Sequence, residues 1–514
     1  MPHVRSVLAP LVVALAAVLA GPATAAPGDA LFAPGARVHT VDLAFAQPAW
    51  WDTLVANWGE GFEEYIPATV TIDGVVYDSV GVRMKGHSSF QHPNDKKPFR
   101  LSFDEYHGSQ RIDGLKGLHL DNGWEDPTLL REKLHLDFLR EAGVAAPRGD
   151  FAWLTLNGQP WGLYGLVEHV DKTFLGTRFG SKSGEFYKAA DAEGALGPSD
   201  FAWWGPGTAP YESRYELKSD PAPDSWTRLA ALIDTLAHTN DAAAALPSRI
   251  DLPRFWRAMA ADNLLGNLDS YSGSCHNFYV YFEPATSRMQ WVVWDVGLSL
   301  GAYAIPALEP ETQPLAFVGD PLKQPLLGRM FADTTLRRGY LEAYRSLRNE
   351  WFDPERLAAR VDTLAALVRP WIVADTRRMY TVAQFETNLF ADVVVDGRRK
   401  PGLVSFLRRR ARSVDAQFAE LDGVTPAAPC RVDGCAPHPA RVSTTIDLEL
   451  SRAGRARLDV YDLSGRRVAE LADEWLPAGP HAVPCDVRGW RPGVYLVRLR
   501  AGGGEATRRL VVVP

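Results

Sequence analysis

The chain has 514 residues, 46% of them hydrophobic, and a formal net charge of −7 at pH 7. One hydrophobic core rarely serves a chain of this length, so we expect two or three domains, and the apolar content with 16 Trp excludes a disordered protein. The negative net charge gives no support to nucleic-acid binding, although it is compatible with a local basic pocket for an anion.

Residues 1–25 have the pattern of a signal peptide. Arg5 precedes an apolar run, and Ala23-Thr24-Ala25 has the small-x-small pattern of a cleavage site. The run is shorter than the roughly 20 residues that a membrane-spanning helix needs, although a retained anchor is the alternative. We therefore expect export, a secreted or cell-surface location, and no membrane span after cleavage.

The next part of the chain, to about residue 171, predicts a β-rich unit with one inserted helix. Apolar and polar residues alternate, with a "DG" turn signal, in "ARVHTVDLAF", "YIPATVTIDGVVYDSVGVRMKG" and "KPFRLSFDEY". In "EDPTLLREKLHLDFLREAGV" the spacing becomes helical, with Asp126 as N-cap, Pro127 at the first helical position and Gly143 as terminator. Strands then return around the "NG" turn of "FAWLTLNGQPWGLYGLVEHVD".

From about Ser225 to Leu421 the pattern is mostly helical, with one clear hairpin in residues 268–297. Residues 426–438 are rich in Pro and Gly, which is typical of a linker, and Cys430 and Cys435 within them could close a small loop. Short strands at regular spacing in residues 439–514 predict a small all-β sandwich. The expected fold class is α+β, with a main unit over residues 26–425.

Three polar residues surround the expected hairpin: Asp269 in the loop before it, Asn277 at its start and Asp295 at its end. In protein kinases the catalytic Asp follows a long helix, an Asn a few residues later holds a metal, and a hairpin leads to a second metal-binding Asp. Phosphoryl transfer needs a carboxylate to orient the acceptor hydroxyl and oxygen ligands for Mg²⁺. We therefore predict a catalytic Asp269 and a metal held by Asn277 and Asp295. The alternative is that the three residues only cap turns and end a strand.

Cations suited to phosphate lie in the β-rich region. Arg83 and Lys85 share one strand and precede a loop of small residues that includes Ser88. The cation that holds phosphate could be Lys85, Lys97 or Arg100, and their spacing does not choose between them. A solvated strand face is the alternative interpretation of Arg83 and Lys85.

Two glutamates complete the expected nucleotide site. Glu132, on the inserted helix, could pair with the phosphate-binding cation, although a surface Glu in a first helical turn is the alternative. Glu168 lies where the β-rich part hands over to the next segment, a natural place for a contact with the adenine edge. In the alternative interpretation, Glu168 and Asp171 are salt-bridge partners at a hinge.

Several motifs, in order, resemble those of the CotH family, the spore coat protein H type of atypical secreted protein kinase. They are "VGVRMKGHSSF", "KKPFRLSF", "LREKLHLDFLREAG", "GLYGLVEHVDKTFL", "YELK", "NLDSYSGSCHNFYVYF" and "WDVGLSLG". The resemblance covers roughly residues 38–421. It implies a bilobal kinase-like fold, with a β-rich N-lobe and a helical C-lobe. It also implies binding of ATP with Mg²⁺ (or Mn²⁺) and phosphorylation of Ser/Thr on surface or exported proteins. By position, Asp269 would be the catalytic-loop Asp and Asp295 the metal-binding Asp.

One motif departs from the family pattern. Members commonly have W-D-x-D, whereas this chain has Trp294-Asp295-Val296-Gly297. If the first Asp binds the metal, "DVG" falls where a typical kinase has Asp-Phe-Gly and activity is kept. A catalytically silent surface structural or binding protein of the kinase fold is the alternative. The C-terminal segments "ARLDVYDLSGRRVAEL" and "GVYLVRL" resemble the FlgD-like or type IX sorting-type β-sandwich, which implies surface delivery.

Overall fold

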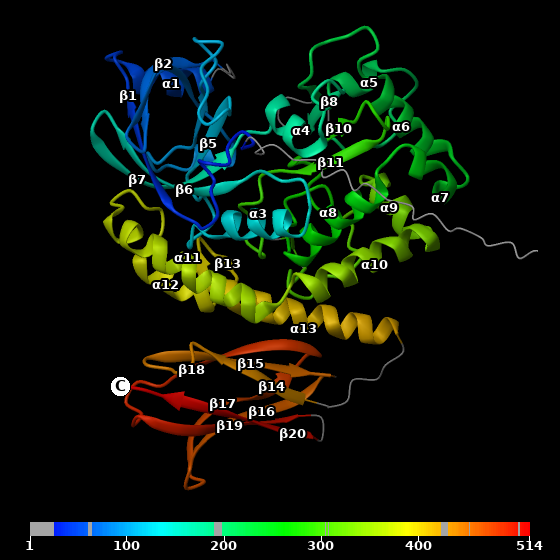
Figure 1. Cartoon of the computed structure of the whole chain (residues 1–514). Coiled ribbons are helices and arrows are strands. Elements are labelled where there is room, and N and C mark those ends of the chain that lie inside the picture. The colour runs from blue at the N-terminus through cyan, green and yellow to red at the C-terminus, as the bar shows by residue number, and fades with distance from the viewer. Residues whose placement is uncertain are drawn as a thin grey trace, which may run out of the picture.

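The computed structural model describes residues 25–59, 64–189, 198–303, 305–306, 308–422, 430–451, 453–501 and 504–514. The predicted signal peptide lies outside the described residues, apart from its last position. Figure 1 shows a sheet-rich N-terminal region, a largely helical middle region and an all-β C-terminal region. The fold class is therefore α+β, as the sequence predicts.

Seven strands of the N-terminal region form a closed barrel in the order β1-β2-β3-β4-β5-β7-β6. Only the contact of β1 with β6 is parallel among these neighbours. The strands are β1 (Val38–Ala44), β2 (Ile66–Ile72), β3 (Val75–Met84), β4 (Phe99–Ser102), β5 (Gly117–Asp121), β6 (Gly149–Leu156) and β7 (Gln159–Glu168).

The alternation of β4 places apolar residues inside the barrel and polar residues outside. Phe99, Leu101 and Phe103 are fully buried in the barrel core, while Arg100 points to the other face. Helix α1 (Trp50–Gly59) packs on the barrel, and α2 (Ser88–Gln91) follows β3.

The inserted helix α3 (Arg131–Glu141) starts later than the sequence predicts. Leu129 has a φ of 58°, so the backbone enters the helix only after this residue, and the prediction of Asp126 as N-cap is wrong. Asp126 still accepts a hydrogen bond from the backbone N–H of Arg131 at 2.9 Å and pairs with the Arg131 guanidinium. Gly143, with a φ of 74°, follows the helix end as predicted.

The middle region contains a second sheet, in the order β11-β10-β8-β9. Its hairpin β10 (Phe278–Phe282) and β11 (Met289–Val293) is the one that the sequence predicts, and every residue of both strands is buried. The strands β8 (Phe186–Ala189) and β9 (Tyr215–Leu217) extend it and were not predicted. A further small hairpin, β12 (Val393–Val395) with β13 (Arg398–Lys400), also lies among the helices.

The helices of this region share one large hydrophobic core with α3 and the second sheet. Those of eight residues or more are α4 (Lys172–Phe179), α6 (Thr227–His238), α8 (Leu252–Leu264), α9 (Pro325–Ala332), α10 (Thr334–Glu350), α11 (Pro354–Ala374), α12 (Val382–Phe390) and α13 (Leu403–Leu421). The shorter ones are α5 (Ala209–Glu212), α7 (Ala242–Ala245) and η1 (Leu246–Ser248). Within the described residues, none of the helices has the length and apolar character needed to cross a membrane.

The C-terminal region forms two sheets, β14-β15-β18 and β17-β16-β19-β20, around a core of their own. The strands are β14 (Cys430–Ala436), β15 (Ser443–Leu450), β16 (Gly454–Asp462), β17 (Arg467–Leu476), β18 (Gly479–Asp486), β19 (Gly493–Ala501) and β20 (Gly504–Val512). Figure 1 shows α13 lying along this region, and Arg412 of α13 lies 3.3 Å from Asp433 of β14.

The strand β14 lies within residues 426–438, the range expected to be a linker, and pairs with β15. Its extended backbone separates the Cα atoms of Cys430 and Cys435 by on the order of 16 Å, far more than a disulfide allows. Both cysteines are buried free thiols, so the small disulfide-closed loop is not formed. Cys275 is also a buried free thiol.

Candidate functional site

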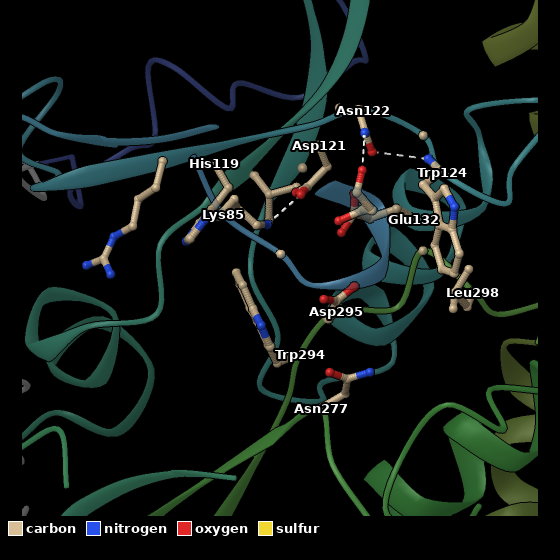
Figure 2. A pocket seen from close by; sticks show the side chains of 18 of the residues that line it. Lys85, His119, Asp121, Asn122, Trp124, Glu132, Asn277, Trp294, Asp295 and Leu298 are labelled. Carbon is tan, nitrogen blue, oxygen red and sulfur yellow. Dashed lines mark hydrogen bonds and ion pairs between the residues drawn. The ribbon is translucent and has the colours of Figure 1, made fainter. Parts of the chain in front are cut away.

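A cavity of about 270 Å³ lies between the barrel, α3 and the β10–β11 hairpin. Figure 2 shows Lys85, which follows β3, with His119 and Asp121 of β5 on one side of it, and Asn277, Trp294 and Asp295 on the other. Most of the residues that the sequence singled out line it, namely Arg83, Lys85, Ser88, Arg100, Glu132, Asp269, Asn277 and Asp295.

Two rows of side chains cross the outer face of the barrel toward this cavity. In one row, Arg83 of β3 lies directly opposite Arg100 of β4, and Arg100 lies opposite His119 of β5. In the next row, Lys85 follows β3 and meets Asp121 of β5. Because side chains on one face of a strand repeat every second residue, the rows are about 7 Å apart. We call them the arginine row and the lysine row.

The arginine row is joined by a hydrogen-bonded chain of two histidines. A guanidinium only donates, so Arg100 Nη2 donates to His169 Nε2 at 2.8 Å, and His169 Nδ1–H then donates to His119 Nε2 at 2.8 Å. Burial, together with Lys85, lowers the pKa of His119 well below its usual value, and burial with Arg100 does the same for His169. Both rings are therefore neutral near pH 7, beside permanently charged arginines.

Carboxylates surround the ammonium of Lys85. Its Nζ lies 2.5 Å from Asp121 Oδ1, so Lys85 pairs with Asp121 rather than with the predicted Glu132. Burial disfavours the charge of Lys85, yet its pKa is raised because Asp121, Asp295 and Glu132 all attract the proton. Burial, followed by repulsion from Asp121 and Asp295, raises the pKa of Glu132 well above its usual value. Glu132 thus lies beside Lys85 and keeps its proton to a higher pH than an ordinary glutamate.

The loop that carries Asp269 is positioned by the end of α8. Gly266, with a φ of 59°, ends the helix, and the backbone N–H of Asn267 donates to the carbonyl of Asp262 at 2.8 Å. A Cβ at Gly266 would lie 2.6 Å from Phe406, so this close turn requires glycine. The chain then reaches Asp269, which is buried apart from 8% of its surface.

Asp269, His276 and Asn277 form one cluster. The amide of Asn277 donates to the carboxylate of Asp269 at 3.0 Å and to its backbone carbonyl at 2.9 Å. His276 Nε2 lies 3.3 Å from the other carboxylate oxygen. These contacts fix the orientation of the carboxylate that the sequence predicts to be catalytic. His276, the residue before Asn277, thus has Asp269 as its partner.

Asp295 faces the cavity from the end of the hairpin. Its φ is 52° and that of Asn277 is 62°, left-handed conformations that Asp and Asn tolerate better than most residues. Although its side chain is open to the cavity, protein surrounds it, and this burial raises its pKa to about 6, with Asp121 and Asp269 adding repulsion against the opposing effect of Lys85. Asn277 and Asp295 thus have strained backbones and bring side-chain oxygen atoms close to the carboxylates of Asp121 and Asp269. Such an arrangement could hold a hard divalent cation.

Two of the predicted nucleotide-binding residues do not line the cavity. Lys97 Nζ donates to the carbonyls of Phe90 at 2.6 Å and His92 at 2.5 Å, and so fastens the segment around α2. Glu168 is fully buried between Arg148 and Arg178, with Oε1 2.6 Å from Arg148 Nη2 and Oε2 2.9 Å from Arg178 Nη2. The salt-bridge interpretation therefore describes Glu168, and a contact with an adenine edge does not. Asp171 instead caps α4, where its side chain accepts hydrogen bonds from backbone N–H groups.

Sequence reasoning missed several residues of the cavity: Asp121, His119, His169, Trp294 and Tyr279. Trp294 packs edge-on against His119 at 4.9 Å, and Lys85 Nζ lies 5.6 Å from the Trp294 ring centre. The alternation in "GLHLDN" was the available signal, because it puts His119 and Asp121 on the same outward face as Arg100.

Within the described residues, no group of three or more His, Cys, Asp or Glu side chains has the geometry of a metal site.

Comparison with known proteins gives two family matches. Residues 82–413 match the model for the CotH kinase protein family, and residues 436–513 match the secretion system C-terminal sorting domain. The second match marks the chain for export, to the medium or the cell surface.

Two relatives cover most of the chain. Inner spore coat protein H of Bacillus subtilis is 23% identical over 356 residues, which are 68% of this chain and 90% of that protein. Invasin CotH3 of Rhizopus delemar is 24% identical over 422 residues, which are 74% of this chain and 67% of that protein. Among solved structures, the twitchin kinase region of C. elegans is 11% identical and covers 81% of this chain and 71% of that one. Its TM-score of 0.20 is too low to establish a shared fold. The family model, which spans more than half of the sequence, identifies this chain as a member of the CotH kinase protein family with a C-terminal sorting domain.

Proposed function

We propose that this chain is an exported protein kinase that transfers the γ-phosphate of ATP to Ser/Thr hydroxyls of surface or exported proteins, with Mg²⁺ or Mn²⁺. One observation carries the proposal: Asp269, Asn277 and Asp295 reach one cavity from the two ends of the β10–β11 hairpin, facing Lys85 across it. In this proposal the barrel acts as the N-lobe of a bilobal kinase and the helical region as its C-lobe.

Asn277 and Asp295 are the residues that would hold the metal ion. Mg²⁺ usually keeps several waters and is bound through one or two carboxylates plus substrate phosphates, so a set of one carboxylate and one amide oxygen is sufficient. Burial, with repulsion from Asp121 and Asp269, raises the pKa of Asp295 to about 6, and a cation at this position would offset both effects. The ion would neutralise charge on the transferred phosphoryl group. The absence of a second Asp in Trp294-Asp295-Val296-Gly297 leaves this set intact, because position 295 supplies the carboxylate.

Asp269 would orient the acceptor hydroxyl and receive its proton. His276 and Asn277 hold the carboxylate from two sides, which fixes its direction before a substrate arrives. Since Asn277 contacts both the carboxylate and the metal position, it would keep the attacking oxygen and the ion in a constant relation.

The two rows of cations would hold the phosphates. The lysine row brings Lys85 beside Asp295, at the metal end, and the arginine row lies about 7 Å further along β3. Two guanidinium groups directly opposite each other on adjacent strands repel, so a bound anion would stabilise that arrangement. Ser88, in the loop after Lys85, would add a hydroxyl donor. We therefore assign phosphate binding to Lys85, Arg83 and Arg100, and not to Lys97.

A second function is a surface structural or binding protein that keeps this fold without activity. The missing second Asp favours it, as does the name of the relative from Bacillus subtilis, a spore coat protein. Such a protein could still bind a nucleotide.

Incubation of the purified chain with labelled ATP and Mg²⁺ or Mn²⁺ tests the proposal. We expect self-phosphorylation by the wild type and its loss in Asp269→Asn, which keeps the acceptor for Asn277 but removes the base. Removal of a general base typically costs about 10²–10⁴-fold in rate. A matched control, Asp224→Asn, changes an exposed carboxylate that does not line the cavity and should keep full activity. A wild type without label, or a label undiminished in Asp269→Asn, contradicts kinase activity. Thermal stabilisation by nucleotide without labelling favours the silent binding protein.

A further inference from the structure

Two buried polar side chains face each other between the helix of Glu132 and the helix that leads into the Asp269 loop. His135 lies one turn after Glu132 on α3, is 0% exposed, and has no hydrogen-bond partner at either ring nitrogen. Asp262, near the end of α8, is 3% exposed, and its Oδ1 lies 3.6 Å from His135 Nε2. A pair of this kind is costly to bury unless it shares a proton or a hydrogen bond.

Asp262 also fastens the start of the Asp269 loop. Its Oδ1 accepts from the side-chain amide of Asn267 at 3.0 Å, and its backbone carbonyl accepts from the Asn267 N–H at 2.8 Å. The carbonyl of Asn267 accepts in turn from the Ser270 hydroxyl at 2.8 Å. Asp269 lies between Asn267 and Ser270, so a displacement of Asp262 is transmitted to it within one turn of chain.

The environment keeps His135 uncharged near pH 7 and holds the proton of Asp262 up to about that pH. Burial alone lowers the pKa of His135 to about 3, and burial raises the pKa of Asp262 to about 7, against the hydrogen bond from Asn267. Tyr340 of α10 also faces Asp262, but its phenol donates to the carbonyl of Leu315 at 2.6 Å. Arg410 of α13 is the nearby cation on that side, and it is bound to Asn263 at 2.6 Å and to Tyr344. The imidazole of His135 is thus the acceptor that the Asp262 carboxyl faces.

We propose that His135 and Asp262 form a proton-sharing latch between α3 and the Asp269 loop. The protonated carboxyl of Asp262 donates its O–H to the lone pair of His135 Nε2, whose ring carries its own hydrogen on Nδ1. The present separation exceeds a hydrogen bond, so the latch closes by a small movement of either side chain. When the proton leaves to solvent, a negative charge stays buried at Asp262. The ring can then move its hydrogen to Nε2 and donate to the carboxylate, but the cost of burying the charge still weakens the contact between α3 and the loop. Both are positioning residues, since neither lines the cavity.

The latch makes the fold less stable as the pH rises. Because the folded-state pKa of Asp262 lies above the ordinary value near 4, the folded protein holds this proton more tightly than the unfolded chain does. The stabilisation is fully present below the unfolded pKa and is lost as the pH rises through about 7. The inference rests on the proposed function only where it calls the Asp269 loop catalytic, because the pH effect on stability needs no nucleotide.

The variant Asp262→Asn tests the latch. Its amide keeps an oxygen for Asn267 and presents an N–H to His135, but it does not titrate. Thermal unfolding of the full chain from pH 5 to 8.5 should show the smallest difference at pH 5 and a melting temperature higher in the variant by on the order of 5 °C at pH 8.5. Asp224→Asn is the matched control and should follow the wild type at every pH. Parallel melting curves for Asp262→Asn and wild type across the range would overturn the proposal.

Two further measurements keep the test decisive. In the wild type labelled with ¹⁵N-histidine, the His135 signals, assigned with His135→Gln, should be those of a neutral ring and should move near pH 7, although the ring itself does not titrate there. A signal unchanged between pH 6 and 8 contradicts the latch even if Asp262→Asn fails to fold. If Mg²⁺-ATP stabilises the wild type, the pH dependence of that shift near 7 should weaken in Asp262→Asn. If ATP does not stabilise the wild type, but its melting temperature differs from that of Asp262→Asn at high pH, the result supports the latch and contradicts the kinase proposal.

Discussion

Two groups of charged residues lie at the edge of the barrel, one around Glu168 and one around Lys85, and they are built in opposite ways. Around Glu168, two arginines and a backbone N–H donate hydrogen bonds to both carboxylate oxygens, and Glu168 does not line the cavity. Around Lys85, one ammonium is shared by Asp121, Asp295 and Glu132, and burial with mutual repulsion raises the pKa values of the last two. The first cluster is electrostatically complete, whereas the second lacks positive charge.

The difference teaches how to tell a structural ion pair from a site. A carboxylate that holds the fold together has its partners already, so its removal damages stability and little else. A carboxylate crowded by others is held in an unfavourable place by the surrounding structure, which points to a ligand that supplies the missing charge. This distinction predicts opposite effects for matched substitutions in the two clusters.

The largest effect is expected from Glu168→Gln. The change leaves Arg178 without a carboxylate and leaves the buried Arg148 with only the half-exposed Asp29, and removal of one partner from a buried ion pair costs about 3–5 kcal/mol. Chemical denaturation should show this loss in the free energy of unfolding, while binding of Mg²⁺-ATP to the folded fraction stays unchanged. Glu105→Gln, an exposed glutamate of the barrel region, is the control. If Glu168→Gln is as stable as the wild type but does not bind nucleotide, Glu168 belongs to the nucleotide site after all.

The second effect is the reverse combination, in Asp295→Asn. Asn tolerates the left-handed backbone at this position, so the fold should be kept, and relief of the repulsion from Asp121 and Asp269 should leave stability equal or slightly higher. Affinity for Mg²⁺-ATP should fall by about 100-fold, because the metal loses its carboxylate. Calorimetric titration with Mg²⁺-ATP measures the loss, with ATP alone as reference. Retained Mg²⁺ dependence would remove Asp295 from the metal site.

Much of this site was predictable from local pattern, because the residues that build it lie on elements with clear periods. The alternation of β3 and β4 puts Arg83, Lys85 and Arg100 on a polar face, and the hairpin places Asn277 and Asp295 at its two ends. Such relations depend on spacing within one element or across one turn. These relations do not depend on how the rest of the chain folds.

The parts that failed depend on which distant elements meet. Lys85 pairs with Asp121 because β4 lies between β3 and β5 in a closed barrel, and no spacing in the sequence reveals that register. Glu168 forms an ion pair with Arg148 because β6 and β7 are neighbours in the sheet, and this pairing brings residues 20 positions apart into contact. The late start of α3 has a local cause, the left-handed Leu129, but a leucine gives no signal for that conformation.

The smallest effects separate the three cations that spacing alone left open. Arg100 faces the cavity and anchors the histidine chain, so Arg100→Gln should weaken Mg²⁺-ATP binding by about tenfold, the value of one charge-assisted hydrogen bond. Lys97→Met should leave that affinity within about twofold and lower the free energy of unfolding by about 1 kcal/mol, because its ammonium serves only the carbonyls near α2. Both variants remove one positive charge, so long-range electrostatics alone would weaken binding equally in the two. Equal losses in calorimetric titration would therefore mean that the arginine row acts only through its net charge, and a loss confined to Lys97→Met would place the phosphates on the opposite side of β4.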